Sequence, residues 1–78
     1  MKKEKVGFAA FDKESGKGLN VVWGITNKLY LTDDPEKLYL ARSSKEAKIY
    51  TVWFNDTHKN KKEFEIKEVV ISIEVRSK

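Results

Sequence analysis

The sequence contains no cysteine and a single proline, and only two of its 78 residues are arginine. Without cysteine, neither a disulfide nor a thiolate-bound metal can support the fold. The longest apolar runs fall far short of the ~20 residues that a membrane-spanning helix needs. The basic start, Met1–Lys5, leads into Val6–Phe11, which is too short for a signal-peptide core. We therefore expect a soluble, cytoplasmic protein with no membrane partner.

Motifs for catalysis or cofactor binding are also missing. His58 is the sole histidine, and no further His or Cys completes a metal site with it, so we expect a solvated loop residue. No serine stands in the Gly-x-Ser-x-Gly context of a hydrolytic nucleophile. Gly16-Lys17-Gly18 lacks the rest of a phosphate-binding pattern and precedes a strand-like segment, which favours a hairpin loop. We expect no enzyme activity, no catalytic residue, no metal and no cofactor.

What the chain does contain is charge and aromatic rings. Its 36% charged and 40% hydrophobic residues make it too apolar for a disordered chain. Nine aromatic residues compensate for the small core, because each large ring buries ~150–250 Å². The net charge of +4 rests mostly on lysine, which is less suited than arginine to bidentate phosphate contacts. These features predict a single folded domain over residues 1–78.

The tetrapeptide Lys-Leu-Tyr-Leu occurs twice, at Lys28–Leu31 and at Lys37–Leu40. The intervening Thr32–Glu36 is acidic and contains the proline, which is typical of a turn. Two strand-like runs around a turn predict a β-hairpin. In that hairpin the leucines of both copies share one face, and Tyr30 and Tyr39 lie on the other.

An alternative for the same segment is a short helix. Asp34 can cap such a helix, because Pro35 would then occupy its first position. In either case Asp33, Asp34 and Glu36 are interpreted as turn residues, since an oxygen cage for a cation needs six or more ligands.

Three further strands are predicted. Val6–Phe11 and Leu19–Ile25 form a first hairpin around a polar loop, and alternate residues of the second strand share one face: Leu19, Val21, Trp23 and Ile25. The last strand, Phe64–Val75, changes phase, because its first apolar residues have even numbers and its later ones odd numbers. A β-bulge or bend near Lys67-Glu68 would place both sets on one face.

A helix is predicted from about Ser44 to Thr57. Ser43 and Glu46 have the spacing of a capping box, in which each side chain satisfies a free backbone N–H. Five residues fall on one arc of the helical wheel: Ala47, Ile49, Tyr50, Trp53 and Phe54. Lys48, Thr51 and Asn55 fall opposite them. The alternative is a strand, because Ile49–Phe54 is β-branched and aromatic.

These elements predict an α+β fold with the order β-β-β-β-α-β, in which one mostly antiparallel sheet is covered by one helix. Two basic segments are candidate anion or nucleic-acid sites: Arg42, Ser43, Ser44 and Lys45 before the helix, and Lys59, Lys61 and Lys62 after it. The second segment follows Trp53 and Phe54, and lysines beside exposed rings suit single-stranded nucleic acid.

The favoured function is a small non-enzymatic protein that binds another protein, as an inhibitor, adaptor or accessory factor of the kind that phages and mobile elements encode. Tyr30 and Tyr39 are the candidate contact residues, because tyrosine is enriched in interfaces. Homodimerisation through Val69–Val75 is a variant, since an uncovered apolar edge invites pairing. The alternative function is single-stranded nucleic-acid binding.

Overall fold

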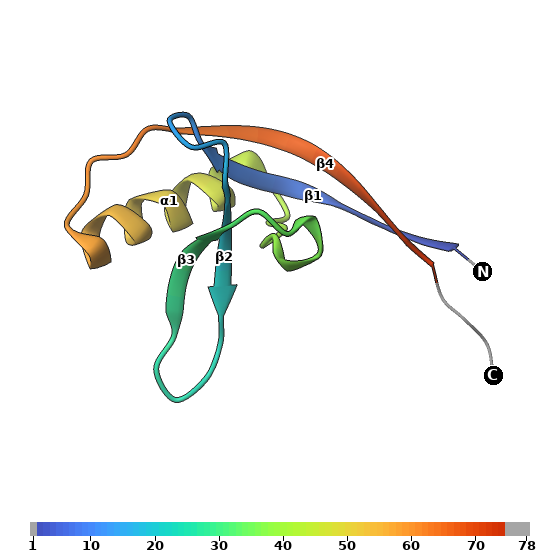
Figure 1. Cartoon of the computed structure of the whole chain (residues 1–78), viewed down its shortest axis with the longest axis horizontal. Coiled ribbons are helices and arrows are strands. Elements are labelled where there is room, and N and C mark those ends of the chain that lie inside the picture. The colour runs from blue at the N-terminus through green and yellow to red at the C-terminus, as the bar shows by residue number, and fades with distance from the viewer. Residues whose placement is uncertain (1, 75–78) are drawn as a thin grey trace.

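The computed structural model describes residues 2–74, and within them one α-helix and four strands form an α+β fold (Figure 1). The strands are β1 (Lys2–Asp12), β2 (Gly18–Val22), β3 (Lys28–Thr32) and β4 (Phe64–Glu74). A 3-10 helix, η1 (Pro35–Lys37), and the α-helix α1 (Ser44–His58) lie between β3 and β4. The strand order is β3-β2-β1-β4, and neighbouring strands are antiparallel. The predicted α+β class is confirmed, with one covering helix.

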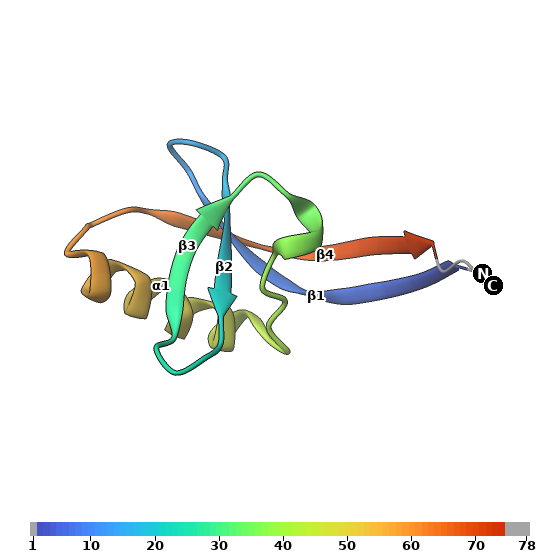
Figure 2. The same ribbon diagram turned by 60° about the horizontal axis from the view of Figure 1, so that its bottom comes forward.

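The sheet consists of two ribbons that meet at a single residue pair. β1 and β4 pair without interruption from Lys2↔Glu74 to Asp12↔Phe64, and β2 pairs with β3 along its length. The pairing that joins them is Phe11↔Gly18. Figures 1 and 2 show that the β2–β3 hairpin consequently runs across the β1–β4 ribbon instead of continuing beside it.

Half of the β1–β4 ribbon projects from the body. In both views residues 2–6 and 70–74 extend away from α1 as a two-stranded arm (Figures 1 and 2), and the molecule measures 45 × 28 × 22 Å. Val6 and Val70 face each other across the arm, and 60% and 57% of their surfaces remain exposed. The arm therefore presents apolar side chains outside the core.

The two copies of Lys-Leu-Tyr-Leu fold differently. The first copy is strand β3, as predicted. The second copy is not a strand, so the predicted hairpin is wrong and the short-helix alternative is confirmed. The Asp34 side chain accepts a hydrogen bond of 2.9 Å from the Glu36 N–H, and Pro35 is the first residue of η1. The rigid ring of Pro35 suits a first helical position, and the capped turn redirects the chain.

The segment Leu38–Ala41 joins the two ribbons. The Tyr39 N–H donates to the Leu19 carbonyl at 3.0 Å. Phe8 and Ala41 exchange two backbone hydrogen bonds, of 2.8 and 2.9 Å, as an antiparallel bridge. The segment therefore bonds to β2 and to β1 in the space where those strands diverge.

Helix α1 begins as the sequence predicts. The Ser43 hydroxyl accepts a hydrogen bond of 3.1 Å from the Glu46 N–H, whereas the Glu46 carboxylate accepts from the Tyr39 hydroxyl at 3.0 Å. Lys59 caps the other end in a left-handed conformation with φ of 53°. The strand alternative for this segment is wrong.

The buried side of α1 differs from the predicted arc. Ala47, Thr51 and Phe54 are buried, while Ile49 is mostly exposed. Thr51, predicted to face solvent, satisfies its hydroxyl by donating to the Lys48 carbonyl at 2.6 Å. Because that hydroxyl has a local partner, the residue enters the interior without leaving an unpaired polar group.

The predicted bulge in the last strand is wrong. Pairing with β1 is regular from Phe64 to Glu74, and Val75 lies outside the described residues. Phe64 and Ile66 pack against the core cluster on the α1 side of the sheet. Val69 and Ile71 have the other parity and are half-buried on the opposite face. The phase change therefore marks a change of covered face along one regular strand.

Candidate functional site

Four aromatic rings gather where the β2–β3 hairpin meets α1. Trp23 follows β2, Tyr39 belongs to the joining segment, and Tyr50 and Trp53 lie one turn apart on α1. The Trp23 ring centroid is 6.2 Å from that of Tyr50 and 6.4 Å from those of Tyr39 and Trp53. The Tyr39 and Tyr50 centroids are 4.5 Å apart. We call these four residues the aromatic cluster.

The aromatic cluster is only partly covered. Trp23 is 55% exposed, and the other three rings are half-buried. Ile49, which is 58% exposed, precedes Trp53 by four residues and so lies beside it on the helix surface. An indole held by several ring contacts loses little conformational freedom when a partner covers it. The cluster and Ile49 therefore form a preorganised apolar surface.

The alternating pattern predicts that Trp23 and Ile25 lie in one strand with Leu19 and Val21, on the same face. Leu19 and Val21 are in β2 and are both buried, but β2 ends at Val22, so the prediction is wrong for Trp23 and Ile25. Ile25 is fully exposed in the turn that follows. Gly24 begins that turn, since its N–H donates to the Asn27 side chain at 3.2 Å. The glycine was the available signal that the strand stops before Trp23.

Tyr30 and Tyr39 do not share a surface in the predicted way. Tyr30 is exposed on β3, on the same face as its partner Asn20, whereas Tyr39 lies outside any strand and inside the aromatic cluster. Burial raises the pKa of the Tyr39 phenol, and its hydrogen bonds act in the same direction. Tyr39 therefore remains neutral and donates its hydroxyl hydrogen to Glu46. Its ring also packs edge-on against that of Trp23.

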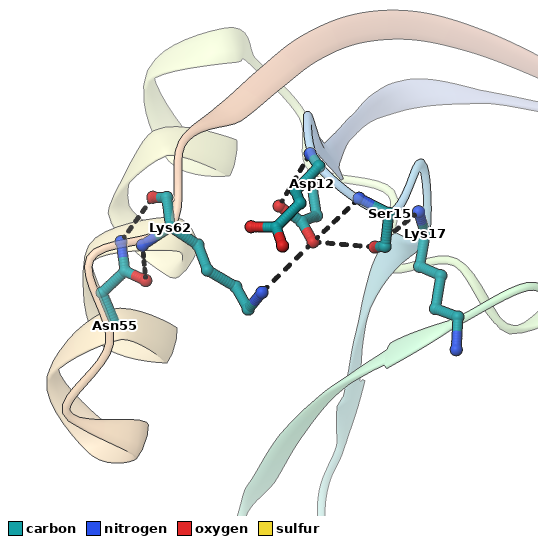
Figure 3. Close-up of polar contacts among 6 residues, drawn as sticks. Asp12, Ser15, Lys17, Asn55 and Lys62 are labelled. Atoms are coloured by element: carbon teal, nitrogen blue, oxygen red, sulfur yellow. Dashed lines mark hydrogen bonds and ion pairs between the residues drawn. The ribbon is translucent and has the colours of Figure 1, made fainter.

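A polar network joins the β1–β2 turn to the loop that follows α1 (Figure 3). Asp12, 1% exposed, accepts hydrogen bonds from the Ser15 hydroxyl at 2.7 Å and from the Lys62 ammonium at 3.4 Å. The N–H groups of Glu14 and Ser15 also donate to its carboxylate. Asn55 holds Lys62 by two side-chain-to-backbone hydrogen bonds of 3.0 and 3.1 Å. This arrangement is a structural tie, because each of its groups is occupied by a partner within the fold.

Charge and hydrogen bonding set the ionisation of Asp12. The hydrogen bond from Ser15 is the largest cause that holds the pKa of its carboxyl below the usual range, and burial opposes it. The backbone donors and Lys62 act with Ser15. Asp12 is therefore a carboxylate at neutral pH, and it forms an ion pair with the Lys62 ammonium.

The two predicted basic sites lie at opposite ends of α1. Arg42–Lys45 is at its beginning, where Ser43 serves as the cap, and Lys59 and Lys61 are exposed after its end. Fifteen helical residues separate the two groups by about 21 Å at 1.5 Å per residue. They do not form one site.

Trp53 and Phe54, the rings predicted to lie beside the basic loop, are engaged elsewhere in the structure. Phe54 is buried, with its ring centroid 5.6 Å from that of Phe64, and Lys62 is engaged by Asp12. Trp53 faces the aromatic cluster. The basic loop therefore has no ring of the predicted pair beside it for stacking on bases.

His58 has a structural position. It is the last residue of α1, its ring centroid is 4.4 Å from that of Phe54, and its Nε2 lies 2.7 Å from the Leu29 carbonyl oxygen. A carbonyl oxygen only accepts, so Nε2 carries the proton in this hydrogen bond. The prediction of a solvated loop histidine is correct in that His58 is exposed, but wrong in placing it in a loop, because His58 ends α1 and its ring links the helix to β3.

A groove lies between the arm and the joining segment. Its volume is about 550 Å³, and its walls include Lys5, Asn20, Leu38, Leu40 and Ile71. Within residues 2–74 no three His, Asp or Glu side chains are close enough together to hold a metal ion. None of the helices in the same range has the length and apolarity to cross a membrane.

Comparison with known proteins gives no relative. No protein-family model, no curated protein and no solved structure matches this chain. The surface that the fold presents is therefore the basis for assigning a function.

Proposed function

We propose that this chain is a small, non-enzymatic, cytoplasmic protein that binds another protein, as an inhibitor, adaptor or accessory factor. The observation that carries this proposal is Trp23, a half-exposed indole fixed in place by Tyr39, Tyr50 and Trp53. Tryptophan and tyrosine dominate the binding energy of protein interfaces when they lie at the centre of a desolvated patch. Ile49 extends the surface and would contribute apolar area beside the rings.

The test compares variants of the full chain, immobilised and exposed to an extract of its source cells. Ile49→Asp places a charge within the surface, and Trp23→Ala removes its anchor. Loss of such an anchor typically costs about 2 kcal/mol or more, roughly thirtyfold in Kd. We expect both variants to lose the captured protein.

Val52→Asp is the matched control. Val52 is 61% exposed and lies one turn after Ile49, on the side of Ile49 that faces away from Trp53, about 100° around the helix from that ring. The control should retain the captured protein, and all variants should keep the helical circular dichroism of the parent. Capture that survives Ile49→Asp, or that is lost equally with Val52→Asp, would reject the aromatic surface. Tyr30→Ala tests the remaining sequence-based candidate in the same assay.

Single-stranded nucleic-acid binding is the competing proposal. It would use the exposed Lys59 and Lys61, and it would need bases to stack on rings that the basic loop does not bring with it. An oligonucleotide that binds the wild-type chain and is lost on Lys59→Gln and Lys61→Gln would favour this function instead.

A further inference from the structure

The outer edge of β4 is open along the arm. β4 is the terminal strand of the sheet, so its second row of backbone N–H and C=O groups has no strand partner among residues 2–74. A strand edge of this kind is a template for another strand. The arm itself is a two-stranded ribbon, and such a ribbon is marginally stable in water until further strands or a covering layer join it.

The two free edges of the arm differ in sequence. The β1 edge carries Lys3, Glu4 and Lys5, and charged residues, lysine above all, are a common protection against edge pairing. The β4 edge carries Val69-Val70-Ile71-Ser72, which has no charge and three β-branched apolar residues. The β4 edge is therefore the one suited to pairing.

We propose that two copies of this chain pair through β4, antiparallel and about a two-fold axis at Val70, to form one continuous sheet. A two-fold interface uses the same patch on both copies, and an antiparallel strand edge is complementary to itself under that symmetry. This homodimer does not depend on the proposed function of the aromatic cluster.

The sequence selects the register. With Val70 opposite its own copy, Val69 lies opposite the Ile71 of the other chain, and Glu68 lies opposite its Ser72. Each cross-strand pair at the centre is then apolar, and no like charges face each other.

Neighbouring registers are less favourable. A two-fold axis at Glu68 places two carboxylates directly opposite, which is destabilising. An axis at Val69 places Glu68 opposite Val70 and Lys67 opposite Ile71, so that charged side chains replace apolar partners. The axis at Val70 also covers part of that valine, which is 57% exposed in the single chain.

The first test is the mass of the full chain in solution, measured by sedimentation equilibrium over a wide concentration range. We expect the mass to rise from 9.1 kDa toward twice that value. Val70→Lys places two ammonium groups opposite each other and should abolish the dimer. Val52→Lys, at an equally exposed valine of α1, should dimerise like the parent. A parent that stays monomeric at every concentration, or equal behaviour of the two variants, would overturn the proposal.

The second test uses the absence of cysteine, because any introduced thiol is unique. Residues directly opposite in antiparallel strands have Cα atoms ~4.5–5.5 Å apart, within the range of a disulfide. Under mild oxidation Val70→Cys should form a covalent dimer, and a mixture of Glu68→Cys and Ser72→Cys chains should cross-link to each other. Val52→Cys reports random collision. Cross-linking of Val70→Cys no faster than Val52→Cys would overturn the pairing, and efficient self-linking of Glu68→Cys would overturn the register.

Discussion

Asp12 shows how a single buried residue holds distant parts of this chain together. Its carboxylate organises the turn after β1 through Ser15 and binds Lys62, which is fifty positions away in sequence. Buried carboxylates are costly unless they are paired and hydrogen-bonded, and Asp12 is both. Sequence reasoning counted Lys62 with the exposed lysines, because nothing local to either residue indicates that they meet.

The lowered pKa of Asp12 predicts acid sensitivity. Its hydrogen bonds favour the charged form in the folded state, whereas an unfolded aspartate titrates near ~3.9. The stability that Asp12 contributes is therefore complete above that unfolded value and is lost as the pH falls through the lower folded value. We expect the melting temperature to fall with acid below about pH 4, and Asp12→Asn to lower it at neutral pH while flattening that fall.

Asp33→Asn provides the control for this prediction. Its carboxylate is exposed and lies 3.8 Å from the Lys17 ammonium, in an ion pair of the kind that contributes little to stability. The control should reproduce the melting profile of the parent. Parallel acid profiles for the parent and Asp12→Asn would show that Asp12 is not the titrating group.

At the scale of elements, the segment Leu38–Ala41 is the joint between two crossing ribbons. Two glycines leave space for this segment to pack closely against β1 and β2. A Cβ added at Gly7 would lie 2.7 Å from the Leu40 Cβ, and a Cβ added at Gly18 would meet the end of the Leu38 side chain. The Leu40 Cβ is fixed by the bridge between Phe8 and Ala41, whereas the end of Leu38 can turn away. A methyl group added at Gly18 should therefore be tolerated better than one added at Gly7.

This inequality predicts that Gly7→Ala destabilises the fold more than Gly18→Ala. Overpacking against fixed backbone costs about 1–3 kcal/mol, while alanine also removes freedom from the unfolded chain and so favours folding by ~0.4–1 kcal/mol. Gly7→Ala should show a clear net loss, and Gly18→Ala a small change. Urea unfolding of both variants measures the difference. A larger loss for Gly18→Ala would mean that Leu38, and not the bridge at Ala41, is the rigid part of the joint.

Local signals predicted some elements and failed where distant contacts decide the structure. Ser43 and the residues after it place the start of α1 correctly, because capping depends on neighbours in sequence. The repeat of Lys-Leu-Tyr-Leu misled, since the second copy is shaped by the η1 turn and by bonds to Leu19 and Phe8. The β4 phase change predicted a bulge on the assumption of one covered face, whereas the ribbon is covered on different faces along its length.

The candidate surface was less accessible to sequence reasoning than the fold. Alternation predicts that Trp23 continues the strand face of Leu19 and Val21, whereas Trp23 follows the end of β2 and is 55% exposed beside the turn at Gly24. Tyr39 was assigned to a surface and instead supports Trp23. Both differences arise because the aromatic cluster joins three segments whose proximity depends on how the ribbons cross.

At the scale of the whole molecule, the aromatic cluster and the apolar β4 edge lie at different ends of the part of the chain that the structure describes. The aromatic cluster lies on the body beside α1, and the uncharged β4 edge lies on the arm. The lysines among residues 2–74, by contrast, are spread over β1, β3, β4, both helices and the loops. We therefore propose that recognition by this chain relies on apolar contact, with the net charge of +4 in a secondary role.

The salt dependence of partner binding distinguishes apolar recognition from recognition by charge. The affinity of the full chain for its captured partner should change little between low and high salt, because screening weakens charge contacts and leaves apolar burial intact. Lys59→Gln with Lys61→Gln should have a small effect, whereas Ile49→Asp should abolish binding at every salt concentration. A partner whose affinity falls steeply, with a log–log slope near ~−0.7 for each phosphate neutralised, and that ignores Ile49→Asp, would be a single-stranded nucleic acid and would contradict the account.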